Sequence, residues 1–186
     1  MLEIREEIPS LEALAHYAAV PISFFGHSRF QVIQNGDKWN LSEETVPEFF
    51  KDYDTLERPI DWFTRFDMSK WIIFSAFQND VRIGSLIVAF NTPGVYMLEG
   101  RTDLALLWDI RIATEFRNRG IGSLLFEKAV MWSMERGCTE LKVETQDINV
   151  AACRFYAKMG FQLRTIRHNQ YPGLPDEIQF LWYREL

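Results

Sequence analysis

The sequence predicts an α/β fold, in which helices flank a mixed sheet, within a single domain that spans residues 1–186. Two observations carry this prediction. From residue 70 onward, apolar runs of strand length alternate with helical patterns in the order β-β-β-loop-α-β-α-β-β, and strands joined through helices form mixed α/β domains. No repeat, low-complexity tract or Gly/Ser-rich linker interrupts the chain, whose length is usual for one domain.

The first 69 residues are broken by four prolines, so short elements are expected there. A helical pattern covers residues 11–19, and a strand-like run covers residues 29–33, ahead of the Asn35-Gly36 turn signal. Ser42, which is followed by two glutamates and a threonine, predicts the start of a further helix. An aromatic segment at residues 59–66 completes this part of the chain.

Three strands are expected next. Residues 71–77 and 81–90 are predicted to form a hairpin around a Gln-Asn-Asp turn. Gly84, inside the second strand, indicates a bulge or a close approach of backbone. Residues 104–112 are rich in leucine and isoleucine and are expected to be a strand buried on both faces.

Two helices and three strands complete the predicted elements. The helix over residues 123–136 ends before Gly137, a position typical of a helix C-terminal glycine. Its predicted apolar stripe consists of Leu124, Leu125, Val130, Met131 and Met134. Asn149 is expected to cap a second helix over residues 150–159. The strands are expected at residues 141–145, 161–166 and 178–183.

The composition excludes several classes of protein. Hydrophobic residues make up 47% and charged residues 25%, which is globular rather than disordered composition. A pI near 5.2 argues against a nucleic-acid partner. The absence of a bilayer-length apolar run and of a signal peptide predicts no membrane partner and a cytoplasmic location. The two cysteines form no CxxC pair and the histidines are isolated, so no metal site is expected.

The most informative segment is a buried strand that is followed by a turn with two glycines and a helix. Gly120 and Gly122 allow backbone amides to approach a ligand closely. The helix start adds unpaired N–H groups and the positive end of the helix dipole, and Arg117 and Arg119 add two cations. This pattern predicts a pyrophosphate site, with a solvated loop as the alternative. It is neither the dinucleotide fingerprint nor a P-loop.

The segment Arg117-x-x-Gly120-x-Gly122, preceded by a strand that ends Asp-Ile-Arg-Ile, resembles the acetyl-CoA motif of the GNAT superfamily of N-acetyltransferases. A second block, residues 144–161, is similar to the strand and helix of this family with its Asn-x-x-Ala, Phe-Tyr and Gly-Phe pattern. Together with the aromatic tail at residues 180–183, it is similar to streptothricin acetyltransferases in particular. The likeness covers roughly residues 70–186.

The resemblance implies a GNAT fold, with a mixed, mostly antiparallel central sheet that is splayed at the acetyl-CoA strand and flanked by helices. Acetyl-CoA is then the acetyl donor. Backbone groups of Ile110 and Ile112 are expected to bind its pantetheine arm, and Asn149 the pantetheine or the far arm of the cofactor. The residues expected to hold the pyrophosphate are Arg117, Asn118, Arg119, Gly120, Ile121, Gly122 and Ser123.

Tyr156 is the candidate general acid. It lies about two helical turns after Asn149, so both residues share one helix face. The resemblance implies that this tyrosine also contacts the cofactor and protonates the departing thiolate, a transfer that the reference pKa of a phenol suits. Cys153, on the same helix, is interpreted as a small buried residue beneath the cofactor rather than as a nucleophile.

The general base is left open. Trp108 occupies the position where many relatives have a glutamate, and strand alternation places Trp108 and Asp109 on opposite faces. Asp109 and Glu144 are the candidates. Each has an alternative role as a structural carboxylate, paired with Arg111 or Lys142, and a water chain to backbone carbonyls is a further option.

The charge distribution bears on the acceptor. Residues 1–60 hold eleven acidic and five basic residues, whereas the remainder holds equal numbers. We therefore interpret residues 1–69 as a divergent substrate-side lobe and residues 70–186 as the acetyl-CoA-binding core. The lobe's carboxylates would attract a cationic amine, and aromatic residues would wall its site, although a solvated acidic face is the alternative. These aromatic residues are Phe49, Phe50, Trp62 and Phe63.

These observations predict an N-acetyltransferase that moves acetyl to a primary amine of a small cationic molecule, such as a streptothricin-like antibiotic or a polyamine. The amine attacks directly within a ternary complex. The alternatives are a protein N-terminal or lysine acetyltransferase and a non-catalytic acyl-CoA-binding regulatory module. Because dimers are common among resembling proteins, a homodimer is a further option.

Overall fold

The computed structural model describes residues 1–35 and 38–186, which fold into two compact units. The first unit consists of residues 1–23, 52–142 and 185–186, and the second of residues 24–51 and 143–184. Neither unit begins or ends at residue 70. The single domain, with its substrate-side lobe and cofactor core, therefore stays a prediction. Gly36 of the predicted turn lies outside the described residues.

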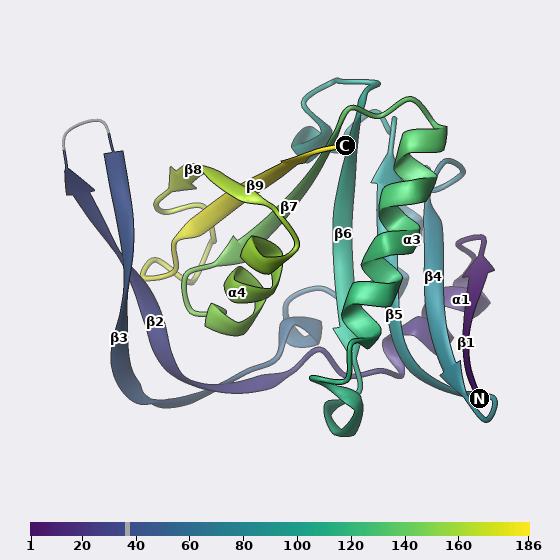
Figure 1. Cartoon of the computed structure of the whole chain (residues 1–186), viewed down its shortest axis with the longest axis horizontal. Helices are drawn as coiled ribbons and strands as arrows, with labels where there is room; N and C mark the ends of the chain where they lie inside the picture. The colour runs from purple at the N-terminus through teal and green to yellow at the C-terminus, as the bar shows by residue number, and fades with distance from the viewer. Residues whose placement is uncertain (36–37) are drawn as a thin grey trace. The chain divides into compact units, whose positions relative to one another are not determined.

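The elements alternate as the sequence predicts (Figure 1). The first unit contains β1 (Leu2–Glu7), α1 (Leu11–Ala18), the 3-10 helix η1 (Tyr53–Thr55), α2 (Pro59–Arg65), β4 (Ile72–Gln78), β5 (Val81–Phe90), η2 (Tyr96–Leu98), β6 (Leu104–Ile112), η3 (Thr114–Phe116) and α3 (Ile121–Glu135). The second contains β2 (Phe24–Asn35), β3 (Lys38–Lys51), most of β7 (Glu140–Gln146), α4 (Val150–Lys158), β8 (Gln162–Arg167) and most of β9 (Gln179–Glu185). The α/β class and the order from β4 to β9 are confirmed.

The sheet of the first unit has the order β1-β4-β5-β6, and each neighbouring pair is antiparallel. In Figure 1, α3 crosses one face of β4, β5 and β6, while α1 lies behind the strands. The core beneath α1 and α2 is rich in aromatic side chains, with Tyr17 and Trp62 almost fully buried and Trp108 packed against them. Aromatic rings bury large apolar areas, so this core fixes α1 and α2 on the sheet.

Gly84 confirms both expectations for its position. The register between β4 and β5 shifts beside it, so that Ile83 has no direct partner. A Cβ atom at Gly84 would lie 2.5 Å from Ile112 Cδ1 and 3.1 Å from the carbonyl oxygen of Arg111. A glycine therefore lets β5 approach the end of β6 closely.

The prediction of a helix that starts at Ser42 is wrong. Residues 38–51 form β3, which pairs with β2 as a two-stranded antiparallel ribbon in the second unit. Local capping signals were outweighed by β-branched and aromatic residues that pair across the ribbon. Pro47 fits because it lies in a register shift, where a missing N–H breaks no ladder bond, and Gly26 leaves room for the ring of Phe49.

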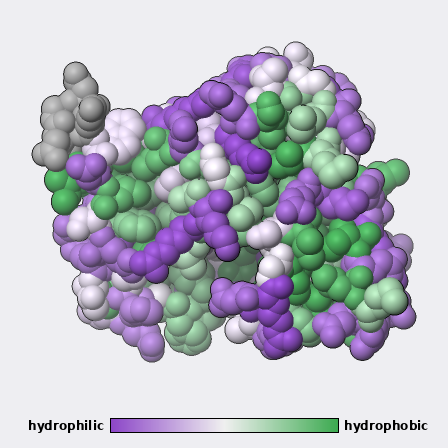
Figure 2. Space-filling view, in the orientation of Figure 1, coloured by the Kyte–Doolittle hydropathy of each residue, from purple (hydrophilic) through white to green (hydrophobic). Residues whose placement is uncertain are grey.

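The predicted apolar stripe of α3 is only partly correct. Leu125 is buried, but Leu124, Met131 and Met134 are exposed, and Figure 2 shows apolar surface over this region. The buried face consists of Ile121, Leu125, Phe126, Ala129, Trp132 and Ser133. Apolar residues stand next to one another along this helix, so the 3.6-residue period fits two different helix faces equally well. Contact with the sheet decides which face is buried.

The second unit holds the strand order β7-β9-β8, in which β8 and β9 are antiparallel. Its helix α4 begins as predicted, because the side chain of Asn149 accepts a hydrogen bond from the N–H of Ala152 at 3.2 Å. Val150, Cys153 and Tyr156 are buried at three-residue intervals. This spacing gives α4 one apolar face.

Candidate active site

The loop between β6 and α3 has the geometry of an anion site. Asn118 and Gly120 adopt positive φ angles of 61° and 81°, and Gly120 precedes the helix without any side-chain cap. The first N–H groups of α3, from Ile121 to Ser123, therefore lack partners within the helix. Nothing lies within 4 Å of the position that a Cβ of Gly120 would take. The open side and the helix dipole suit a pyrophosphate.

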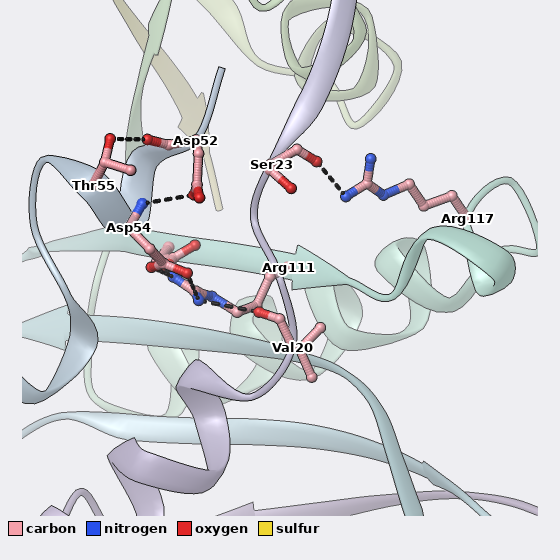
Figure 3. Close-up of polar contacts among 8 residues, drawn as sticks. Val20, Ser23, Asp52, Asp54, Thr55, Arg111 and Arg117 are labelled. Atoms are coloured by element: carbon pink, nitrogen blue, oxygen red, sulfur yellow. Dashed lines mark hydrogen bonds and ion pairs between the residues drawn. The ribbon is translucent and has the colours of Figure 1, made fainter. Parts of the chain in front are cut away.

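The two arginines of this loop have different environments. Arg117 donates from a terminal nitrogen to the carbonyl of Ser23 at 3.0 Å (Figure 3). Its Nε donates to the carbonyl of Ile112, also at 3.0 Å. It therefore ties the loop to the end of β6 and to the segment after α1. Arg119 is exposed, and its guanidinium carbon lies 5.3 Å from the ring centre of Phe116. Of the two, Arg119 is the better placed to meet a phosphate.

The backbone of β6 presents alternate residues to its two edges. The N–H of Ala113 donates to Ile83 of β5, so by alternation the backbone groups of Ile110 and Ile112 face the edge away from β5. The bond from Arg117 to the carbonyl of Ile112 agrees with this direction. The arrangement supports backbone binding of pantetheine by Ile110 and Ile112, which stays a prediction together with the splay of the sheet.

The expected opposite placement of Trp108 and Asp109 is wrong. Ile87 of β5 faces Asp109, but the next residue, Val88, faces Leu107, so Trp108 is an extra residue in β6. Leu106 and Ile87 both belong to the core beneath α1 and α2. Leu106, Trp108 and Asp109 consequently share one face, because the bulge interrupts the two-residue alternation. Asp109 thus lies on the same face of β6 as Trp108.

Asp109 belongs to a buried ionic cluster that sequence reasoning found only in part. Arg111 donates to its Oδ2 from Nε at 3.1 Å and from a terminal nitrogen at 2.5 Å. Arg111 also contacts both carboxylate oxygens of Asp54, at 3.1 and 3.2 Å, and the carbonyl of Val20 (Figure 3). Burial raises the pKa of Asp109, although the charge of Arg111 opposes this shift.

Two further polar groups on this side lack a partner. Within the part of the chain that the structure describes, Asp109 Oδ1 and Trp62 Nε1 are buried and have no hydrogen-bond partner. Burying an unpaired polar atom costs free energy, and such atoms mark places where a ligand can complete the hydrogen bonding. An unpaired acceptor and an unpaired donor therefore lie on this face of β6.

Glu144 has a different setting. Tyr171, from the connector between β8 and β9, donates to Oε1 at 2.6 Å, and Gln179 of β9 donates to Oε2 at 2.9 Å. Lys142, its suggested structural partner, forms an ion pair with Glu99. Hydrogen bonds from two neutral donors hold this carboxylate within the second unit. Sequence reasoning found neither donor, because no local motif marks them.

Tyr156 and Asn149 lie on α4 in the second unit. The ring of Tyr156 is almost completely buried and packs edge-on against Phe155 and Phe161. The catalytic and cofactor roles of Tyr156 and Asn149 stay predictions. Phe49 and Phe50 belong to the second unit, and Trp62 and Phe63 to the first, so the aromatic wall also stays a prediction.

Cys153 is a buried thiol, as the sequence predicts. It lies 3.3 Å from the hydroxyl oxygen of Thr145, and burial raises its pKa to about 12. The other cysteine, Cys138, has a pKa raised by burial to about 11. Because the thiolate is the nucleophile, neither thiol is activated near neutral pH.

We expect both thiols to react slowly in the folded protein. At pH 8, the pH lies well below both pKa values, so almost all of each thiol is protonated. Ellman's reagent should label neither cysteine within minutes in native buffer, and both after unfolding in guanidinium chloride. In a Cys138→Ala variant, Cys153 is the single thiol left to label. Rapid labelling of this variant in native buffer would contradict the expectation that the buried thiol is unreactive.

The described residues contain no group of three or more histidine, cysteine, aspartate or glutamate side chains that could hold a metal ion. Over the same residues, every helix is too short or too polar to cross a membrane.

Comparisons with known proteins now identify the family. The family model for acetyltransferases of the GNAT family matches residues 37–161. The chain is 29% identical over 166 residues to streptothricin acetyltransferase A of Bacillus subtilis (strain 168), and the match covers 88% of each protein. It is also 37% identical to the [ribosomal protein bS18]-alanine N-acetyltransferase of Salmonella typhimurium, but over only 38% of this chain and 47% of that protein.

Solved structures agree with this family. A Bacillus anthracis (strain Ames) protein assigned as a streptothricin acetyltransferase, solved with acetyl coenzyme A, has a TM-score of 0.80 and 26% identity, with 100% of this chain and 99% of that chain covered. Nourseothricin acetyltransferase gives a TM-score of 0.76 at 23% identity, covering 99% of this chain and 98% of that one, and shows the fold alone. The fold is thus a mixed, mostly antiparallel sheet flanked by helices, as predicted.

Proposed function

Because the chain belongs to the acetyltransferase (GNAT) family and is an acetyl-CoA-dependent N-acetyltransferase, we propose that its acceptor is a primary amine of a small cationic molecule of the streptothricin class. The observation that carries this proposal is the extent of one match. Similarity to streptothricin acetyltransferase A extends over 88% of the chain and so includes part of the N-terminal segment as well as the cofactor motif.

A protein acceptor is the weaker alternative. Similarity to the ribosomal protein alanine N-acetyltransferase covers only 38% of the chain. This match leaves most of the chain uncovered, so it gives less support for a shared acceptor than the longer match does. A polyamine is also cationic and is therefore a second small-molecule acceptor to compare.

The charge of the site supports a cationic acceptor. Asp54 and Asp109 share one buried guanidinium, so the cluster carries one negative charge in excess. A charge in a buried environment acts over a longer range than one in water, because screening is weaker there. An ammonium group that approaches this side of β6 therefore gains electrostatic free energy.

Asp109 is the better candidate for the base, and Glu144 is the second. Two observations support Asp109: the bulge gives it the same face as Trp108, which stands where many relatives have a glutamate, and burial raises the pKa of its carboxyl. In the proposed reaction, Asp109 accepts the proton that the amine loses as nitrogen bonds to the acetyl carbon. Tyr156 supplies the proton that the departing thiolate takes when the C–S bond breaks.

The residues that would hold acetyl-CoA fit this donor. The uncapped N-terminus of α3 faces open space at Gly120, and Arg119 is exposed beside it. We assign the pyrophosphate to the amides from Asn118 to Ser123 and the pantetheine arm to the backbone of β6. Addition of acetyl-CoA at millimolar concentration should raise the melting temperature of the protein. An unchanged melting temperature would contradict the assignment of the motif.

A screen of amines tests the acceptor. Purified protein is incubated with acetyl-CoA and, separately, with a streptothricin, a polyamine and a peptide that begins with alanine, while released thiol is measured. We expect the streptothricin to give the largest kcat/KM. Thiol release with the peptide alone would favour the protein acceptor and overturn the proposal.

A further inference from the structure

One guanidinium serves two carboxylates in the first unit. Arg111 of β6 is buried, with only 1% of its side chain exposed. Asp54 of η1 binds its two terminal nitrogens, and Asp109 of β6 binds Nε and one terminal nitrogen. Figure 3 shows the carboxylate of Asp54 facing this guanidinium, with the carbonyl of Val20 also within its reach. Two acids therefore divide one cation between them.

Within the described part of the chain, Arg111 is joined by no second cation in this cluster. The ring of Tyr17, from α1, lies 4.8 Å from the guanidinium carbon of Arg111, and Ile87 of β5 faces Asp109. Among the residues that the structure describes, Arg111 is the only ion-pair partner of either carboxylate. With both carboxylates ionised, the cluster has a net charge of −1.

The two carboxylates differ in solvent contact. The side chain of Asp54 is 25% exposed, whereas that of Asp109 is 7% exposed. The position of Asp54 is fixed, because its N–H donates to the side chain of Asp52 at 3.1 Å at the start of η1. The short helix thus holds a solvent-accessible carboxylate against the guanidinium that the buried carboxylate also uses.

We propose that Asp54 is a positioning residue for the proton acceptor: it occupies part of Arg111 and thereby prevents this arginine from fully neutralising Asp109. The proposal rests on the proposed function, because it takes Asp109 as the base. Arg111 with a single carboxylate would form a neutral pair, which is a poor proton acceptor. With Asp54 present, the excess negative charge favours protonation of Asp109 and attracts the ammonium form of the acceptor. The like charge of Asp54 is among the causes that raise the pKa of Asp109.

The test compares Asp54→Asn with Asp61→Asn. The first change removes the charge while an amide oxygen still accepts from Arg111. The second removes one charge from an exposed ion pair with Arg58 on α2, outside the cluster. For Asp54→Asn, we expect the rising limb of the pH profile of kcat/KM to move to lower pH by about one unit, as expected when a nearby like charge is lost. The KM of a cationic acceptor should also rise. Asp61→Asn should leave the profile in place.

A second readout needs no acceptor. Titration of the Asp109 carboxyl carbon by 13C NMR in the free protein should give a lower midpoint in Asp54→Asn than in the wild type and in Asp61→Asn. An unchanged midpoint, in a variant whose melting curve shows it to be folded, would overturn the proposal. Wild-type turnover in Asp109→Asn would also overturn it, since no base would be left to position. With either result, the wild-type protein would still acetylate its acceptor. Absence of acetyl transfer by the wild type would instead overturn the proposed function, so the two failures can be told apart.

Discussion

Replacing Tyr156 with phenylalanine is expected to lower kcat about 10²- to 10⁴-fold, which is the usual contribution of a positioned general acid. The variant keeps the ring that packs against Phe155 and Phe161, so the fold and the binding of acetyl-CoA should change little. Steady-state kinetics by thiol release gives kcat, and calorimetry gives the affinity for the cofactor.

A matched control is Tyr183→Phe on β9. Tyr183 is another buried tyrosine of the second unit, packed beside Arg164, and it has no place in the proposed mechanism. Removing this hydroxyl should change kcat by no more than a few-fold relative to the wild type. If Tyr156→Phe has the turnover of this control, Tyr156 is not the acid.

Replacing Arg111 with methionine is expected to lower the free energy of unfolding by about 3–5 kcal/mol, the usual effect of breaking a buried ion pair. The change leaves Asp109 buried without its cation and frees the carbonyl of Val20. Urea unfolding measures the loss. Arg58→Met, which removes an exposed pair with Asp61, should cost less than about 1 kcal/mol.

The loss of unfolding free energy in Arg111→Met should depend on pH. Burial raises the pKa of Asp109 above its unfolded value. A carboxyl of this kind contributes stability below its unfolded pKa, and this contribution is lost as the pH rises through the folded pKa. Removing Arg111 raises the folded pKa further, so the destabilisation should be larger at pH 7 than at pH 5. An equal loss at both pH values would show that removing Arg111 does not raise the folded-state pKa of Asp109.

The elements from β6 to α4 are predictable from the sequence because their signals are local. The glycines at 120 and 122 mark the turn after β6, and Asn149 caps α4 within three residues of its own position. The helix predicted from Ser42 failed because pairing between two distant strand segments outweighed a local capping pattern. Periodicity within one segment cannot report a partner strand.

The candidate site was predictable only in its parts. Asp109 was a candidate from the motif, but its face depends on a bulge that appears only when β6 pairs with β5. Asp54 and Arg111 are 57 residues apart in sequence, and no spacing rule connects them. The charge of Arg117 suggests a phosphate ligand, whereas in the structure its guanidinium donates to two backbone carbonyls. Long-range pairing decides each of these points.

We propose that this protein transfers acetyl from acetyl-CoA to a cationic, streptothricin-like amine. To test this reaction, the purified protein is incubated with both compounds, and released thiol is followed together with the mass of the acceptor. We expect thiol and a singly acetylated streptothricin to form in equal amounts, and Asp109→Asn to form both much more slowly. Hydrolysis of acetyl-CoA without an acetylated acceptor, or acetylation of an alanine-terminated peptide but not of streptothricin, would contradict the proposal.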